Sequence, residues 1–304
     1  MKLIFKYYIL IFFPALIFFG CSDLRKDIPT TAPVLSVHKE GIKDVNSPNF
    51  HGNLVRLNNW SMKECIQCHA ADYKGGITGK SCFKCHTQPA GPEACNTCHG
   101  DFSDPSKIAP PRDTNGGTSE SSPGVGAHSS HLYTNTLGRI VRCSNCHIVP
   151  KKMSDPGHIE QLPAEINFSG LADTSIAANA SFDVRALTCS NIYCHGNFEF
   201  KKSDAIPTNQ FAYTSDKMVG NNFSPIWNKM DGSQDSCGTC HGLPPTGHID
   251  APLTACYLCH QGIVDENGNI VDKDKHINGR KNARGSLNKL QEFLLKQSGK
   301  KATL

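Results

Sequence analysis

The chain has 304 residues, of which 38% are hydrophobic and 8% aromatic, and its formal net charge at pH 7 is +4. Apolar side chains are scarce for this length, so a compact fold needs something else to fill its interior. The small, dispersed charge argues against a nucleic-acid-binding protein, and the single long apolar run at the N-terminus excludes a protein with several membrane spans.

Residues 1–20 have the pattern of a secretory signal peptide, with two lysines before a short apolar stretch. The stretch ends in Gly20-Cys21, and a small residue directly before a cysteine at this point resembles a bacterial lipobox. We therefore expect Cys21 to be lipidated and residues 21–36 to form a lipid-anchored tether. An ordinary signal peptide and an uncleaved anchor are the alternatives. Ser22, by resemblance to enterobacterial sorting rules, directs such a lipoprotein to the outer membrane.

Fourteen further cysteines form seven pairs, and a histidine directly follows each pair. Six motifs have the form C-x-x-C-H, the attachment signature of c-type haem. Two thiols add to the porphyrin vinyl groups, and the next residue places an imidazole on the iron. The seventh motif is wider, Cys189-Ser-Asn-Ile-Tyr-Cys194-His195, and its longer arch can still reach both vinyl groups.

We therefore predict seven covalently attached haem c groups. The attachment cysteines are Cys65, Cys68, Cys82, Cys85, Cys95, Cys98, Cys143, Cys146, Cys189, Cys194, Cys237, Cys240, Cys256 and Cys259. The proximal iron ligands are His69, His86, His99, His147, His195, His241 and His260. Zinc ribbons, thioredoxin-like motifs and local disulfides also use closely spaced cysteines, but none of them needs a histidine after each pair. For the wide motif a local disulfide beside a solvated histidine stays the alternative.

Seven histidines lie outside the motifs, one for each predicted haem: His38, His51, His128, His131, His158, His248 and His276. The matched numbers predict an imidazole on both faces of every iron. Such ligation leaves no axial position for a substrate and, without methionine, keeps the reduction potential low. It therefore favours electron transfer over catalysis.

Turn-rich residues 101–126 read as a linker between a three-haem module at residues 37–100 and a four-haem module at residues 127–280. Residues 281–304 form a basic C-terminal tail. The first module holds three motifs but only two spare histidines, so one ligand must come from the second. We expect His128 or His131 to supply it, because their spacing places both rings on one side of a helix.

The expected fold is that of a multihaem cytochrome c, mostly irregular coil with short helices and a few short strands wrapped around a haem chain. Residues 164–169 and 181–187 alternate enough in polarity to predict short strands. Residues 285–295 predict either a small amphipathic helix or a frayed tail.

The wide motif is followed by Cys237-Gly-Thr-Cys240-His241-Gly-Leu-Pro-Pro and later by His276-Ile-Asn-Gly. This order resembles the CxxxxCH…CxxCH domain of exported multihaem cytochromes from metal-reducing bacteria, and the first module is similar to the N-terminal part of lipoproteins in that group. The resemblance implies an electron-conducting protein of the outer envelope, with His248 and His276 as distal ligands.

The motifs and the histidine count predict a heptahaem c-type cytochrome that carries electrons. The resemblance implies that these are respiratory electrons passing through the outer envelope toward extracellular acceptors such as metal oxides. Its expected location is the outer membrane, on the periplasmic or cell-surface face. The expected partners are other periplasmic or outer-membrane electron carriers, metal oxides or soluble metal ions, and the membrane through the lipid anchor, with no nucleic acid. The alternatives are a multihaem reductase with one open haem and a filament-forming conductive cytochrome.

Overall fold

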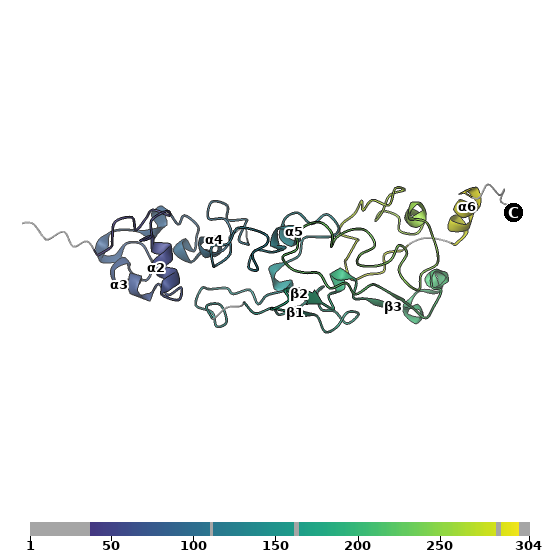
Figure 1. The fold of residues 1–304 in the computed structure, drawn as a ribbon, viewed down its shortest axis with the longest axis horizontal. Coiled ribbons are helices and arrows are strands. Elements are labelled where there is room, and N and C mark those ends of the chain that lie inside the picture. Colours follow the sequence, from purple (N-terminus) through teal and green to yellow (C-terminus); the bar gives the residue numbers. More distant parts are fainter. Residues whose placement is uncertain (1–36, 110–111, 161–163, 284–286, 298–304) are drawn as a thin grey trace, which may run out of the picture. The chain divides into compact units, whose positions relative to one another are not determined.

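The structure is a computed structural model that describes residues 37–109, 112–160, 164–283 and 287–297 (Figure 1). The expected signal peptide, the tether and the lipidation site Cys21 lie outside the described residues. The chain divides into two compact units, Met1–Ser61 and Met62–Leu304.

In the first unit, tight turns lead into helix α2 (His51–Leu57). The backbone N–H of His51 donates to the carbonyl of Ile42 at 2.9 Å, and its ring Nδ1 hydrogen-bonds to the same oxygen at 2.8 Å. Gly41 permits the preceding turn, because its φ is +84° and a Cβ there would overlap the side chain of Ser47. The start of α2 is thus held by two bonds to one loop carbonyl.

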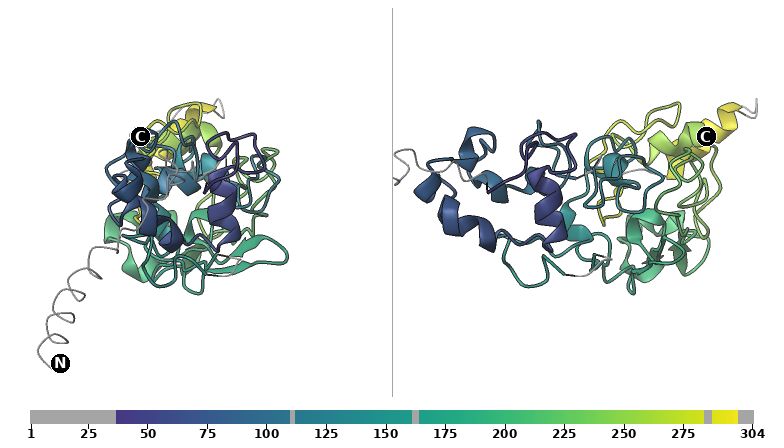
Figure 2. Two further views of the ribbon diagram at one scale, coloured as in Figure 1. Left: turned by 90° about the vertical axis from the view of Figure 1, so that its left-hand side faces the viewer. Right: turned by 60° about the vertical axis from the view of Figure 1, so that its left-hand side comes forward.

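The second unit consists mainly of loops that connect short helices (Figure 2). Its α-helices are α3 (Lys63–His69), α4 (Cys95–Cys98), α5 (His128–Leu132) and α6 (Leu287–Gln297). Its 3-10 helices are η1 (Gly76–Thr78), η2 (Cys82–Lys84), η3 (Gly91–Glu93), η4 (Cys143–Asn145), η5 (Tyr193–His195), η6 (Lys202–Asp204), η7 (Pro207–Ala212) and η8 (Leu253–Leu258). All attachment motifs except the sixth, at residues 237–241, lie wholly or partly in one of these helices.

Two small antiparallel sheets also belong to this unit. Strand β1 (Ser181–Asp183) pairs with β2 (Thr188–Ser190), so that Phe182 lies opposite Cys189. Strand β3 (Glu199–Lys201) pairs with β4 (Lys217–Val219). The first sheet therefore carries the first cysteine of the wide motif.

The strand predictions are only partly correct. Of residues 181–187, the first three form β1, and the chain then turns because the Asp183 carboxylate accepts the N–H groups of Arg185 and Ala186 at 2.8 and 3.0 Å. Residues 164–169 form no strand. Two of their N–H groups, those of Asn167 and Ser169, donate to carbonyls of the fourth attachment motif instead of to a neighbouring strand.

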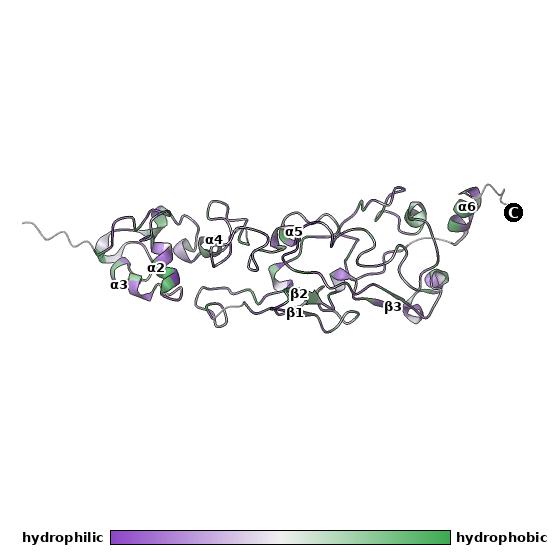
Figure 3. Cartoon of the chain, viewed as in Figure 1, coloured by the Kyte–Doolittle hydropathy of each residue, from purple (hydrophilic) through white to green (hydrophobic). Residues whose placement is uncertain are grey.

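The side chains build only small apolar clusters. Val125 and Ala255 are 2% exposed and Leu290 is 4% exposed, but no large side chain of the described residues falls below 2%. Apolar and polar residues are interspersed along the loops (Figure 3). The structure thus agrees with the composition, because no continuous apolar core is formed by the side chains that the structure describes.

Near the C-terminus the expected amphipathic helix is present as α6, which begins at Leu287 and ends at Gln297. It packs against η8 with Leu290 buried, while Leu294 is 38% exposed. Within the described ranges, no helix is long and apolar enough to cross a membrane. The architecture as a whole is mostly coil with short helices and two small antiparallel sheets, which is consistent with a multihaem cytochrome.

Candidate haem-binding sites

One helical turn brings the functional side chains of a C-x-x-C-H motif together. The N–H of the motif histidine donates to the carbonyl of the first cysteine in four motifs, at 3.0 Å for His86 and His99 and 2.9 Å for His147 and His260. Residues three and four positions apart lie on the same side of such a turn. The spacing therefore directs two thiols and one imidazole to one side of the backbone.

The wide motif reaches a similar result with a strand and a 3-10 helix. Cys189 lies in β2, where its N–H donates to Pro225 O at 3.0 Å, and Cys194 and His195 lie in η5. Asn191 turns the chain between them with a φ of +59°, a left-handed conformation that asparagine tolerates. Both cysteines are free thiols in the structure.

Five spare histidines each lie opposite one motif histidine. The ring centroids are 6.1–6.4 Å apart in all five pairs. The pairs are His158 with His99, His128 with His147, His131 with His195, His276 with His241 and His248 with His260.

This separation fits two imidazoles that share one metal ion. A metal–nitrogen bond of about 2.0 Å and about 1.1 Å from that nitrogen to the ring centre put the two centroids about 6.2 Å apart. Among the described residues, no three His, Cys, Asp or Glu side chains gather to hold a metal ion by themselves. Each pair therefore offers two axial positions, and a porphyrin would supply the equatorial ligands.

Backbone carbonyls orient the rings. In every pair the spare histidine uses Nδ1 for a hydrogen bond of 2.5–3.0 Å to a carbonyl, which leaves Nε2 for a metal. The acceptors are Val125 O for His128, Ala127 O for His131, Met153 O for His158, Ile249 O for His248 and Leu137 O for His276. Four motif histidines make the same kind of bond at 2.8–3.2 Å, namely His69, His147, His241 and His260.

Burial sets the protonation of several of these groups. Desolvation raises the pKa of the Cys189 and Cys194 thiols to about 12 and that of Cys146 to about 11. Desolvation, together with a smaller contribution from the charge of a nearby histidine, lowers the pKa of His128 and His195 to about 4. Because an imidazole binds a metal in its neutral form, these two rings need release no proton near neutral pH.

The expectation that His128 or His131 reaches a motif of residues 37–100 is wrong. Helix α5 does place both rings on one side, but they face His147 and His195, which both belong to the four-motif segment. A histidine from beyond the linker does reach the third motif, and it is His158. The spacing of His128 and His131 shows that both rings lie on one side of α5. It does not show which motif histidines that side faces.

The four predicted ligands outside the five pairs are divided between the two units. His38 and His51 belong to the first unit, and His69 and His86 belong to the second. The His86 ring meets the edge of Phe102 at 5.3 Å, and Nδ1 of His69 hydrogen-bonds to Lys80 O at 2.9 Å.

Trp227 also contacts the site, and the sequence analysis did not identify it. Its indole lies against the rings of His128 and His131. No motif marks this residue, and the one available signal was that the chain has only two tryptophans.

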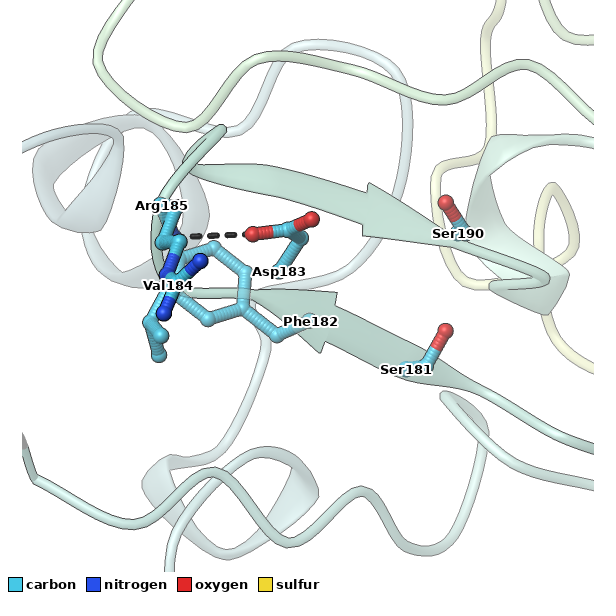
Figure 4. Close-up of a pocket in the computed structure, with 6 residues that line it drawn as sticks. All are labelled: Ser181, Phe182, Asp183, Val184, Arg185 and Ser190. Atoms are coloured by element: carbon cyan, nitrogen blue, oxygen red, sulfur yellow. Dashed lines mark hydrogen bonds between the residues drawn. The ribbon is translucent and has the colours of Figure 1, made fainter.

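A shallow pocket lies at the turn of the β1–β2 hairpin (Figure 4). The backbone N–H of Arg185 donates to Asp183 at its rim. Its lining consists of Ser181, Phe182, Asp183, Val184, Arg185 and Ser190. Neither an imidazole nor a thiol is among them, so this pocket is separate from the paired histidines.

Comparison with known proteins supports the wide motif as a family feature. The family model described as the Geobacter CxxxxCH...CXXCH motif matches residues 188–241, from the start of β2 to the histidine of the sixth motif. No curated protein and no solved structure matches the chain. Residues 188–241 therefore carry the Geobacter CxxxxCH...CXXCH motif, which is consistent with a multihaem c-type cytochrome domain.

Proposed function

We propose that the chain is a heptahaem c-type cytochrome that transfers electrons and is not an enzyme. The five imidazole pairs carry this proposal, because each joins one motif histidine to one spare histidine at a metal-sharing distance. Two motif histidines and two spare histidines remain, which completes the count of seven each.

A haem iron held between two imidazoles exchanges single electrons between its ferric and ferrous states at low potential. The paired histidines would bind the iron from both sides and so exclude substrates from the metal. The Nδ1–carbonyl bonds fix the ring orientations and make the imidazoles stronger donors. The polypeptide would therefore set the distances between the haems and keep substrates away from the iron.

The side chains that the structure describes form no continuous core, and this supports wrapping of the loops around the haem groups. Ile148, which directly follows His147 in the chain, leaves 72% of its surface exposed. A porphyrin ring would cover such groups and bury apolar area that the side chains alone do not.

The sequence supports a place for this protein in the outer membrane as a lipoprotein anchored through Cys21. There it would accept electrons from other periplasmic or outer-membrane carriers and pass them toward metal oxides or soluble metal ions outside the cell. The variant Cys21→Ser should move the protein from the membrane fraction to the soluble fraction, whereas the conservative Ser22→Thr should not. Retention of Cys21→Ser in the membrane would contradict the lipid anchor.

Haem stoichiometry and ligation test the function directly. Purified protein should contain seven covalently bound haems per chain, show low-spin ferric spectra and bind almost no carbon monoxide when reduced. A protein without covalent haem would overturn the proposal. Carbon monoxide binding and a high-spin ferric signal in the wild type would favour the open-haem reductase instead.

A further inference from the structure

Helix α5 supplies ligands to two different motifs, and Trp227 contacts both ligands. The indole meets His128 edge-on, with ring centroids 4.7 Å apart and planes at 90°. It stacks on His131, with centroids 5.9 Å apart and planes at 27°. One side chain therefore restrains the rings that face His147 and His195.

Trp227 is itself held firmly from two sides. Its Nε1–H donates to Pro123 O at 2.7 Å, and its backbone N–H donates to Leu187 O at 2.6 Å. Gly126 leaves room for the indole, because a Cβ at that position would overlap Nε1 of Trp227. The next residue, Asn228, donates through its side chain to Ser121 O at 2.8 Å. These bonds join the chain before α5 to the segment that carries the wide motif.

We propose that Trp227 is a positioning residue that sets the ring orientation of His128 and His131, and thereby the ligand field at two neighbouring haem sites. The inference rests on the proposed haem ligation. The Nδ1 bonds to Val125 O and Ala127 O favour one orientation of each ring, and the indole further restricts rotation of each imidazole about its metal–nitrogen axis. Its stacked and edge-on contacts act on both rings at once, in addition to these bonds.

The two sites differ in a way that can be measured. The planes of His128 and His147 are 22° apart, whereas those of His131 and His195 are 64° apart. Nearly parallel imidazoles give a low-spin ferric haem a rhombic electron paramagnetic resonance signal, and nearly perpendicular imidazoles give a much more anisotropic one. Within the five pairs, only His241 with His276 has a comparably large angle, 69°. Two strongly anisotropic components are therefore expected from these pairs.

Two variants test the role of the indole. Trp227→Leu should abolish one of the two strongly anisotropic components and shift one rhombic component, while the haem content stays unchanged. Trp227→Phe keeps a flat ring against His131 and should restore both components. A wild-type spectrum for Trp227→Leu, or equal changes at all sites, would overturn the proposal.

A second variant tests the proposal if Trp227→Leu does not accumulate in the cell. Gly126→Ala places a Cβ against the indole, at a backbone φ of +44°, and should shift the same two components; an unchanged spectrum would then refute the proposal. Trp60→Leu is the matched control, because Trp60 lies in the other unit. Haem content of the wild type separates the outcomes: absence of haem refutes the proposed function, whereas normal haem with an unaffected Trp227→Leu spectrum refutes only the role of Trp227.

Discussion

Removal of His158 tests the pair that links distant parts of the second unit. Its ring lies 6.2 Å from that of His99, and 58 residues separate the two along the chain. His158→Ala should leave one iron with a single imidazole. We therefore expect one high-spin ferric site and binding of one carbon monoxide per reduced chain. The other sites should keep their low-spin spectra.

The length of the closed loop sets the expected loss of stability. If an iron-mediated link restricts the unfolded chain as a covalent cross-link does, a loop of about 60 residues contributes about 4 kcal/mol. The pair His248–His260 has nearly the same separation, 6.3 Å, but closes a loop of about 12 residues worth about 3 kcal/mol. His248→Ala is therefore the matched control, and the two variants should differ by about 1.4 kcal/mol in the free energy of unfolding.

Guanidinium unfolding, followed by haem absorbance and tryptophan fluorescence, measures this difference. Carbon monoxide titration of the reduced variants counts the opened sites. The variant His158→Met replaces the imidazole instead of removing it. Its thioether ligand should keep the site low-spin and raise the reduction potential of that haem. If His158→Ala opens no site, the pairing of His158 with His99 is refuted. If it destabilises the protein less than His248→Ala does, the dependence of stability on loop length is refuted.

Three further variants test local features. Gly196→Ala should destabilise the protein strongly, because Gly196 has a φ of +92° and a Cβ there would overlap the carbonyl of Cys240; thermal unfolding measures this. Tyr73→Phe removes a 2.8 Å bond to Glu93 and should cost about 1 kcal/mol of unfolding free energy. Burial raises the pKa of Tyr73 most, and the hydrogen bond and charge of Glu93 raise it further. The unfolded chain therefore loses this proton first, and the stability difference between wild type and Tyr73→Phe should shrink as the pH rises above about 10. Cys194→Ser should leave one thioether at the wide motif and shift the reduced pyridine haemochrome band of that haem.

Local spacing predicted local geometry well. A C-x-x-C-H motif occupies one helical turn, so its side chains share a face whatever the rest of the chain does. The same reasoning located α6, whose Leu290 is buried as the periodic pattern requires. It failed for residues 164–169, because alternation of polarity does not show whether a partner strand exists. There the N–H groups of Asn167 and Ser169 bond to the loop of the fourth motif.

The partners of the spare histidines could not be obtained in this way. His248 pairs with His260 nearby in the chain, but His158 pairs with His99 across the segment interpreted as a linker. Counting showed that one ligand must cross to the three-motif segment, and spacing favoured α5. The structure uses α5 for the fourth and fifth motifs, because Trp227 and its bonds to residues 123 and 187 hold the helix beside them.

Two ligand rings are oriented by carbonyls that lie far away in the sequence. His276 is oriented by the carbonyl of Leu137, which lies 139 residues earlier in the chain. His260 is oriented by that of Asn282, 22 residues later. These two carbonyls reach their histidines only after the intervening chain has closed around the site, so the orientations of these two rings depend on the global fold. Loop substitutions that preserve every cysteine and histidine should therefore still alter individual haem sites, and the angle within each imidazole pair is the quantity through which they act.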